Sequence, residues 1–173
     1  MSSEKYFLYF AFGSNLLRER LRLQNPSAEF YCTGRLQGYC LNFGTGTSHL
    51  SNRWHGGVAT VAEKEGCRVW GVVWKISTDN LCTLDEQEGV HCGIYSPLEV
   101  FVETDQGQLR CRTYQLNNFR PTLPSPQYKE VLCLGAHQSG LPPEYIQKLE
   151  ALETNGYVGP SILDDIEQSK KEP

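Results

Sequence analysis

The residues best suited to acid–base chemistry lie together over residues 84–89, which read LDEQEG. Three carboxylates there crowd the end of an expected helix, where the helix dipole already places partial negative charge. Glu88 lies at helical spacing from Leu81, so we expect its side chain to point inward, while Asp85 and Glu86 reach water. Burial and nearby negative charge raise the pKa of a glutamate, which suits a general base near neutral pH. The alternative is a solvated acidic helix end with Glu88 in a surface ion pair.

A second feature that could take part in binding or catalysis is the turn Gly13-Ser14-Asn15. It follows an aromatic-rich run over residues 6–12 and precedes a helical pattern over residues 15–23. Glycine adopts backbone angles closed to other residues, and Ser14 or Asn15 is a favourable helix N-cap. Such a turn aims several backbone N–H groups at one point, which forms a seat for an anion such as a substrate carboxylate. A capped turn that binds nothing has the same sequence features.

The other reactive side chains lack partners in the sequence. His55 follows a tryptophan and precedes two glycines, but no second ligand lies at metal-binding spacing from it, and the other three histidines are equally isolated. We therefore interpret His55 as a structural or hydrogen-bonding residue, and nothing distinguishes Cys92 from the other cysteines. Motifs for a nucleophilic serine, a phosphate-binding loop, a dinucleotide site or a zinc protease are absent. The sequence therefore predicts neither a metal nor a cofactor.

Composition limits the remaining function classes. The chain has 173 residues and a net charge of −4, which favours one domain over residues 1–173 with frayed tails at 1–5 and 168–173. The absence of a basic run argues against nucleic-acid binding. No apolar stretch approaches the roughly 20 residues of a membrane helix, and no signal sequence is apparent, so we expect a cytosolic protein without a membrane partner. Seven scattered cysteines are expected to be reduced and mostly buried.

Short strands and a few helices alternate along the chain, which is typical of an α+β fold. Gly89 is expected to end the helix that carries Glu88, and residues 105–108 to form a hairpin turn. Residues 44–52 are expected to form a loop, and the proline-rich residues 117–127 an extended connector. Strands are expected over residues 6–12, 29–43 (bent), 58–61, 67–76, 95–104 and 109–116, and helices over 15–23, from the cap residues 77–80 to 88, and over 127–137, 143–152 and 162–170.

Five separated motifs agree in order with one family: FAFGSNL at residues 10–16, WHGG at 54–57, WGVVW at 70–74, LDEQEGV at 84–90 and PSPQY at 124–128. Together they resemble γ-glutamylcyclotransferase of the vertebrate cytosolic type, over residues from about 6 to 165. The resemblance implies an enzyme that converts γ-glutamyl amino acids into 5-oxoproline and the free amino acid. It also implies a small mixed β-barrel flanked by helices, commonly as a homodimer.

The resemblance assigns roles to individual residues as well. Glu88 matches the family's catalytic acid/base. Substrate binding is implied for the turn with the strand before it and for two tyrosines: Phe10, Ala11, Phe12, Gly13, Ser14, Asn15, Tyr95 and Tyr128. The family usually has a tyrosine where this chain has Phe12, so a hydroxyl is lost, and we expect weaker activity or an altered substrate preference.

The chemistry of a γ-glutamyl compound agrees with the missing nucleophile and metal motifs. Its own α-amine can attack the γ-amide carbonyl and close a five-membered lactam, so the protein supplies positioning and proton transfer. Two alternatives stay open. One is a related cyclotransferase that acts on glutathione or on γ-glutamyl-amines. The other is a non-catalytic protein that binds γ-glutamyl compounds.

Overall fold

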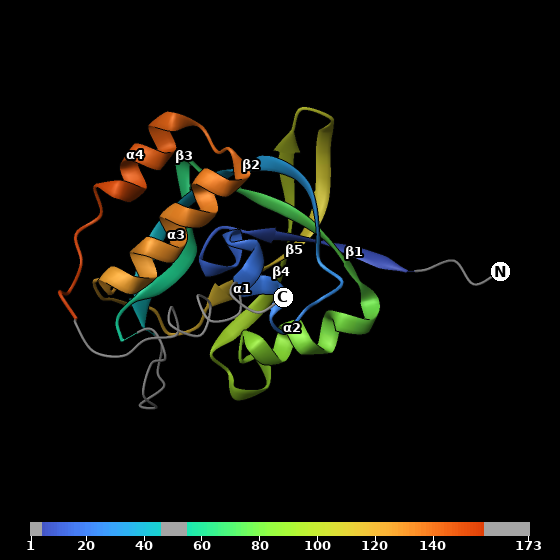
Figure 1. The fold of residues 1–173 in the computed structure, drawn as a ribbon, viewed down its shortest axis with the longest axis horizontal. Coiled ribbons are helices and arrows are strands. Elements are labelled where there is room, and N and C mark those ends of the chain that lie inside the picture. Colours follow the sequence, from blue (N-terminus) through green and yellow to red (C-terminus); the bar gives the residue numbers. More distant parts are fainter. Residues whose placement is uncertain (1–4, 46–54, 158–173) are drawn as a thin grey trace, which may run out of the picture.

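The structure is a computed structural model that describes residues 5–45 and 55–157 (Figure 1). The predicted helix over residues 162–170 lies outside the described residues. The same holds for the predicted loop over residues 44–52 beyond Thr45, and for the two predicted tails apart from Lys5.

Five strands close into a small barrel. They are β1 (Tyr6–Ala11), β2 (Glu29–Thr45), β3 (Val58–Ser77), β4 (Tyr95–Thr104) and β5 (Gly107–Leu116), and a short sixth strand, β6 (Arg120–Pro121), lies outside the ring. They follow the order β3-β1-β5-β4-β2-β6, and an additional pairing of β3 with β2 closes the ring, which leaves β6 at the edge of β2. β1 pairs antiparallel with β3 along its length but meets β5 in parallel only at Tyr9 and Arg112. The predicted α+β fold with a small barrel is confirmed.

The strand boundaries follow the predicted pattern, with one merger. β4 and β5 form the expected hairpin, which turns between Thr104 and Gly107. β2 is the expected bent strand, because its register with β3 shifts at Gly38, where φ is +81°. The two strands predicted over residues 58–61 and 67–76 form one continuous strand, since β3 pairs with β2 along most of its length.

Helices and helical turns connect the strands and cover the barrel. The helices are α1 (Arg18–Arg22), α2 (Leu81–Gln87), α3 (Pro126–Ser139) and α4 (Pro143–Glu150), with 3-10 turns at Ser14–Leu16, Thr78–Asn80 and Val90–Cys92. α3 and α4 lie together on one side of the strands, and α2 lies apart from them at the bottom of the view in Figure 1. α2 ends as predicted, because Gly89 adopts the left-handed conformation with φ +67°.

The segment after the turn differs from its prediction. In place of one helix over residues 15–23, the chain forms a 3-10 turn and then the short α1. The N-cap positions are Gly13 and Leu17, and neither start has a side-chain cap hydrogen bond. The prediction that Ser14 or Asn15 caps the helix is therefore wrong, because the Asn15 side chain is used elsewhere.

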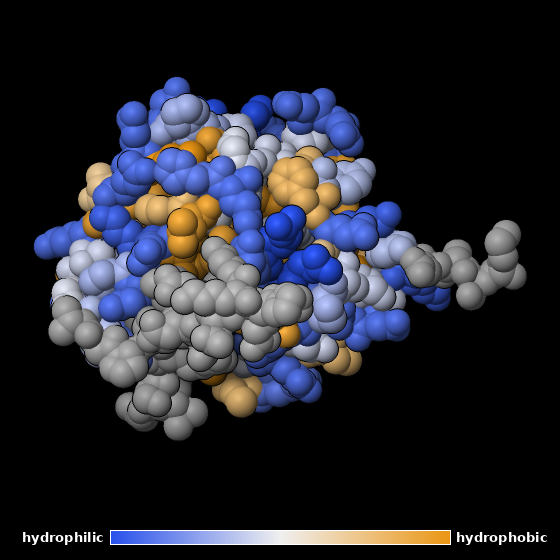
Figure 2. All heavy atoms as spheres, viewed as in Figure 1, coloured by the Kyte–Doolittle hydropathy of each residue, from blue (hydrophilic) through white to orange (hydrophobic). Residues whose placement is uncertain are grey.

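One core connects the barrel to the turn, α2 and α3. Its fully buried side chains include Phe10, Leu16, Trp74, Leu84 and Leu132, each at most 1% exposed. Burial of a side chain of this size contributes roughly 1.5–3 kcal/mol, so this core holds the backbone around it firmly. The face drawn in Figure 2 is largely hydrophilic, and hydrophobic side chains show mainly over α3.

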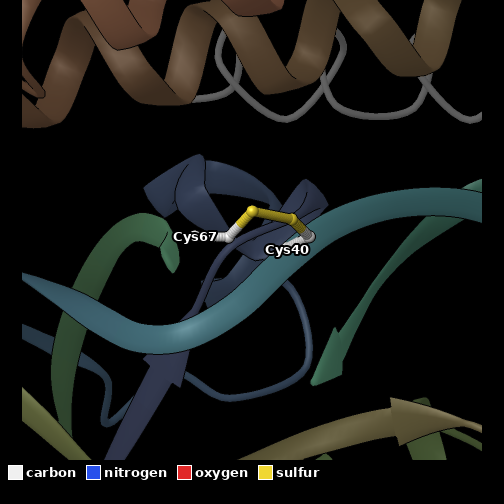
Figure 3. The surroundings of a disulfide bond; sticks show 2 residues. All are labelled: Cys40 and Cys67. Carbon is white, nitrogen blue, oxygen red and sulfur yellow. A yellow bond between two sulfur atoms is a disulfide. The ribbon is translucent and has the colours of Figure 1, made fainter. Parts of the chain in front are cut away.

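The cysteines correct a further prediction. Cys40 of β2 and Cys67 of β3 form a disulfide, with their Cα atoms 5.4 Å apart (Figure 3). The pair lies beside the register shift of the β2–β3 ladder, where residues distant in sequence come together. Among the remaining cysteines Cys111 is buried, whereas Cys82 and Cys92 are exposed. The prediction of seven reduced, mostly buried thiols is therefore wrong.

Candidate active site

Glu88 points into the protein, as its spacing from the apolar side of α2 predicts. Leu84, one turn earlier on the helix, is fully buried and anchors this face. The Glu88 Oε1 atom accepts a hydrogen bond from Asn15 Nδ2 at 3.2 Å and a longer one from the Tyr9 hydroxyl at 3.5 Å. The alternative of a solvated helix end with Glu88 in a surface ion pair is excluded by these contacts.

Burial is the main electrostatic influence on Glu88. It raises the pKa of the carboxyl group from the ordinary 4.5 to about 7. The positive charge of Arg20 and the hydrogen bond from Tyr9 oppose this rise, and the negative charge of Asp85 adds to it. A group with this pKa exchanges protons readily near neutral pH.

Asn15 links the turn to Glu88. Its side chain is 3% exposed, and its Nδ2 donates both to Glu88 and to the Tyr9 hydroxyl, the latter at 3.0 Å. Its backbone carbonyl accepts from Trp74 Nε1 at 3.0 Å, which fixes the turn to the central strand β3. The Asn15 side chain, which was expected to cap a helix, therefore donates a hydrogen bond to the Glu88 carboxylate.

Asp85 is held in an ion pair beside the site. The Arg112 guanidinium donates to both of its carboxylate oxygens at 3.0 Å, and the Tyr114 hydroxyl donates to one of them at 2.5 Å. Asp85 is partly exposed and Glu86 is exposed, as expected, but the ion pair of Asp85 was not predicted. The Tyr114 ring packs edge-on against Tyr9 at 5.8 Å, so this ion pair also supports the hydroxyl next to Glu88.

The two tyrosines named from the family resemblance both bond to the backbone of Ala59. The Tyr95 hydroxyl donates to the Ala59 carbonyl at 3.0 Å, and the Tyr128 hydroxyl accepts from the Ala59 amide at 2.8 Å. Burial raises the pKa of both hydroxyls, and the charge of Glu88 adds to each rise. Both tyrosines therefore lie within electrostatic reach of the buried carboxylate.

Gly13 lies against Tyr128 and Ala59. A Cβ atom at this position would be 2.9 Å from the Tyr128 hydroxyl and 3.1 Å from the Ala59 Cβ, so a side chain would displace the Tyr128 hydroxyl or the turn. The structure thus brings Gly13 and Asn15 together with Glu88, Tyr95 and Tyr128.

The strand residues before the turn are placed differently. Phe10 is fully buried, and its ring approaches Gly71 and packs at 6.3 Å from the ring of Phe12, which is 7% exposed. Ala11 is also buried, within the strand, and Ser14 lies half-exposed in the 3-10 turn. None of these contacts involves Glu88, so the structure does not bring Phe10 or Phe12 to the carboxylate by a described contact.

Tyr9 contacts Glu88, and the sequence reasoning did not include it among the candidate residues. A strand alternates its side chains between two faces, so Tyr9, Ala11 and Gly13 share a face opposite Phe10 and Phe12. Applying that period backwards from the turn would have found Tyr9. Its pKa is raised by burial and by the charge of Glu88, which keeps the hydroxyl protonated and able to donate.

His55 and the side chains that could bind a metal are the remaining candidates for a functional site. The His55 ring stacks on Tyr157 at 4.1 Å, and its carbonyl accepts from Asn155, in keeping with a structural role. Within residues 5–45 and 55–157, no group of three or more His, Cys, Asp or Glu side chains could hold a metal ion. In the same part of the chain, no helix is long and apolar enough to span a membrane.

Comparisons with known proteins agree with each other. Residues 68–149 match the AIG2-like family. Human γ-glutamylcyclotransferase is 51% identical over 165 residues, covering 95% of this chain and 87% of the human protein. The bovine enzyme of the same name is 52% identical over 162 residues, covering 93% of this chain and 86% of that protein. A solved structure of a γ-glutamyl cyclotransferase is similar with a TM-score of 0.90 and 49% identity, over 95% of this chain and 99% of that one.

Proposed function

The chain belongs to the γ-glutamylcyclotransferase family, and we propose that Glu88 transfers the protons in its reaction. In this reaction the α-amine of a γ-glutamyl amino acid attacks the γ-amide carbonyl carbon. A carbon–nitrogen bond forms within the glutamyl group, the bond to the departing amino acid breaks, and 5-oxoproline is released. The observation that carries the proposal is the inward-pointing Glu88 carboxyl group, which contacts Asn15 and Tyr9 and whose pKa desolvation raises to about 7.

The proton balance of the reaction requires a group that both accepts and donates. The α-ammonium group loses two protons on becoming the lactam N–H, and the departing amide nitrogen gains two on becoming an ammonium group. One carboxylate can carry each proton in turn, so no net proton is consumed. A carboxylate with a pKa of about 7 accepts a proton from the α-ammonium group at a smaller free-energy cost than a carboxylate with an ordinary pKa. A glutamate with an ordinary pKa would be a much weaker base.

The turn and the two tyrosines form the proposed seat for the glutamyl group. Main-chain N–H groups of Gly13, Ser14 and Asn15 would hold the substrate carboxylate or polarise its carbonyl. The ring of Tyr95, whose hydroxyl is bonded to Ala59, would form a wall of the pocket together with Tyr128. Holding the amine against the carbonyl in this seat supplies the proximity effect, which is worth several kcal/mol.

The test is the substitution Glu88→Gln, which keeps the size of the side chain and removes its basicity. With γ-glutamyl-alanine as substrate, we expect 5-oxoproline release to fall by about 10²- to 10⁴-fold. The matched control is Glu86→Gln, the same chemical change on the exposed neighbouring residue, which should retain activity. Near-normal activity of Glu88→Gln would exclude Glu88 as the proton carrier.

The substrate class is proposed from the family membership and the high identity. Free γ-glutamyl amino acids are preferred in this proposal over glutathione and over γ-glutamyl-amines such as γ-glutamyl-lysine. A comparison of kcat/KM for the three donors under identical conditions tests it. The proposal requires γ-glutamyl-alanine to give the highest value, and a higher value for glutathione would reassign the chain to a glutathione-degrading enzyme.

We further propose that the enzyme is a cytosolic homodimer of the lyase or acyltransferase type in glutathione metabolism. Besides the family resemblance, support comes from exposed apolar side chains. Leu134 of α3 is 39% exposed, and Tyr6 and Tyr31, each 41% exposed, line a surface hollow of about 650 Å³. Light scattering during size-exclusion chromatography measures the molar mass, and a monomer at micromolar concentration would contradict the dimer.

A further inference from the structure

Three side-chain amides form a continuous hydrogen-bonded chain that ends at Glu88. Asn25 Nδ2 donates to Gln87 Oε1 at 2.9 Å, and Gln87 Nε2 donates to Asn15 Oδ1, also at 2.9 Å. Asn15 Nδ2 then donates to Glu88 Oε1 and to the Tyr9 hydroxyl. Asn25 and Asn15 are at most 3% exposed, and Gln87 between them is partly buried.

The donor-to-acceptor direction of this series of hydrogen bonds is fixed at Asn25, the residue farthest from Glu88. Asn25 Nδ2 also donates to the backbone carbonyl of Leu21 at 3.3 Å, and a carbonyl can only accept. If the Asn25 amide turned over, its oxygen would face the Leu21 oxygen. If Gln87 turned over, its NH₂ group would face that of Asn25. The backbone carbonyl therefore dictates which atom of each amide faces the next, and the last one must present its NH₂ group to Glu88.

We propose that Gln87 is a positioning residue, which holds the Asn15 amide with its donor toward Glu88 and so sets the proton affinity of that carboxylate. The catalytic part of this inference rests on the proposed function of Glu88. A donor facing a carboxylate stabilises its ionised form, whereas an acceptor in the same place destabilises it. The orientation of Asn15 therefore decides at which pH Glu88 becomes a base.

Other charged or titratable groups also act on Glu88 and must stay constant in a test. They come from every element packed around it: Tyr9 of β1, Arg20 of α1, Asp85 of α2, Tyr95 of β4 and Tyr128 of α3. A substitution at position 87 leaves all of these side chains in place.

The experiment uses Gln87→Glu with Gln87→Asp as its matched control. The glutamate in the first variant has two acceptor oxygens and no donor, and it is long enough to draw the NH₂ group of Asn15 away from Glu88. The aspartate in the second variant carries the same charge but is one methylene shorter, so it cannot reach Asn15. The difference between the two variants isolates the effect of the amide orientation from that of the added charge.

Two measurements on the substrate-free protein decide the inference. Carboxyl ¹³C NMR titration, assigned by comparison with Glu88→Gln, should show the pKa of Glu88 rising in Gln87→Glu by about one unit more than in Gln87→Asp, a tenfold difference in proton affinity. Nuclear Overhauser contacts between the Asn15 NH₂ protons and the Tyr9 ring should be lost in Gln87→Glu alone. In activity assays, the acidic limb of the kcat/KM profile should move with the pKa of Glu88.

The inference is overturned if both variants raise the pKa of Glu88 equally and the Asn15–Tyr9 contacts survive in both. In that case position 87 acts through charge alone. Neither readout requires turnover, so the inference can be decided even if Glu88→Gln proves active. A failure of Glu88 as the proton carrier and a failure of Gln87 as its positioning residue are thus separate results.

Discussion

The buried carboxyl group of Glu88 makes the stability of the fold depend on pH, and Glu88→Gln should remove that dependence. The pKa of Glu88 rises from 4.5 to about 7 on folding, so between these values the folded state binds a proton more tightly than the unfolded chain. The stabilising effect is complete below about pH 4.5 and is lost as the pH rises through 7. At about 1.4 kcal/mol per pKa unit, the ionised form costs about 3 kcal/mol at most above pH 7.

Urea unfolding at several values from about pH 5 to about pH 8 measures this effect, because the free energy of unfolding follows by linear extrapolation. The stability of Glu88→Gln relative to the unmodified protein should increase by about 2–3 kcal/mol across that range. The hydrogen bonds of the new glutamine do not depend on pH. They therefore change the free energy of unfolding by the same amount at every pH and do not affect its slope against pH. The control Glu86→Gln, on an exposed side chain, should show no such trend. If the two stability curves of Glu88→Gln and the unmodified protein run parallel within about 0.5 kcal/mol, Glu88 is not desolvated as argued.

Three further predictions follow from single contacts. Tyr9→Phe removes a hydrogen-bond donor to Glu88, so the acidic limb of the kcat/KM profile should move to higher pH. The shift should be less than about one pH unit, because the hydrogen bond is long at 3.5 Å. An unchanged profile would contradict this. Gly135→Ala places a Cβ 2.6 Å from backbone atoms of Leu16 and Leu17, so urea unfolding should show a loss of about 1–3 kcal/mol, and a neutral result would mean that α3 packs less closely. Cys40→Ser opens a disulfide that spans 27 residues, so the free energy of unfolding should fall by about 3.5 kcal/mol. A reductant added to the unmodified protein should lower it by the same amount. If neither change has an effect, the disulfide is absent in solution.

Features set by local sequence could be predicted. The hairpin of β4 and β5, the bend of β2 at Gly38 and the end of α2 at Gly89 each depend on a few adjacent residues. The inward direction of Glu88 also follows from local spacing, because the buried Leu84 one turn earlier fixes the face of the helix. The closed barrel required the family resemblance, since strand alternation alone does not specify which strands pair.

Features that depend on contacts between distant segments were missed or wrong. Asn15 fits a helix cap by its type, but a carboxylate 73 positions later provides a partner that no local pattern reveals. The ion pair of Asp85 was missed, because its guanidinium partner Arg112 lies 27 positions away. The pairing of Cys40 with Cys67 arises from the irregular register of β2 and β3, which the spacing of cysteines does not encode.

Asp85 and Glu88 show how one helix end can hold two carboxylates in different roles. Asp85 accepts hydrogen bonds from the Arg112 guanidinium and from the Tyr114 hydroxyl, so a neighbouring positive charge balances its negative charge. Among residues 5–45 and 55–157, the hydrogen bonds to Glu88 come from neutral donors, the Asn15 amide and the Tyr9 hydroxyl. Desolvation therefore prevails there, and the pKa rises to about 7. A cation bonded directly to Glu88 would stabilise the fold but lower that pKa, and the carboxylate would then be too weak a base to deprotonate an α-amine.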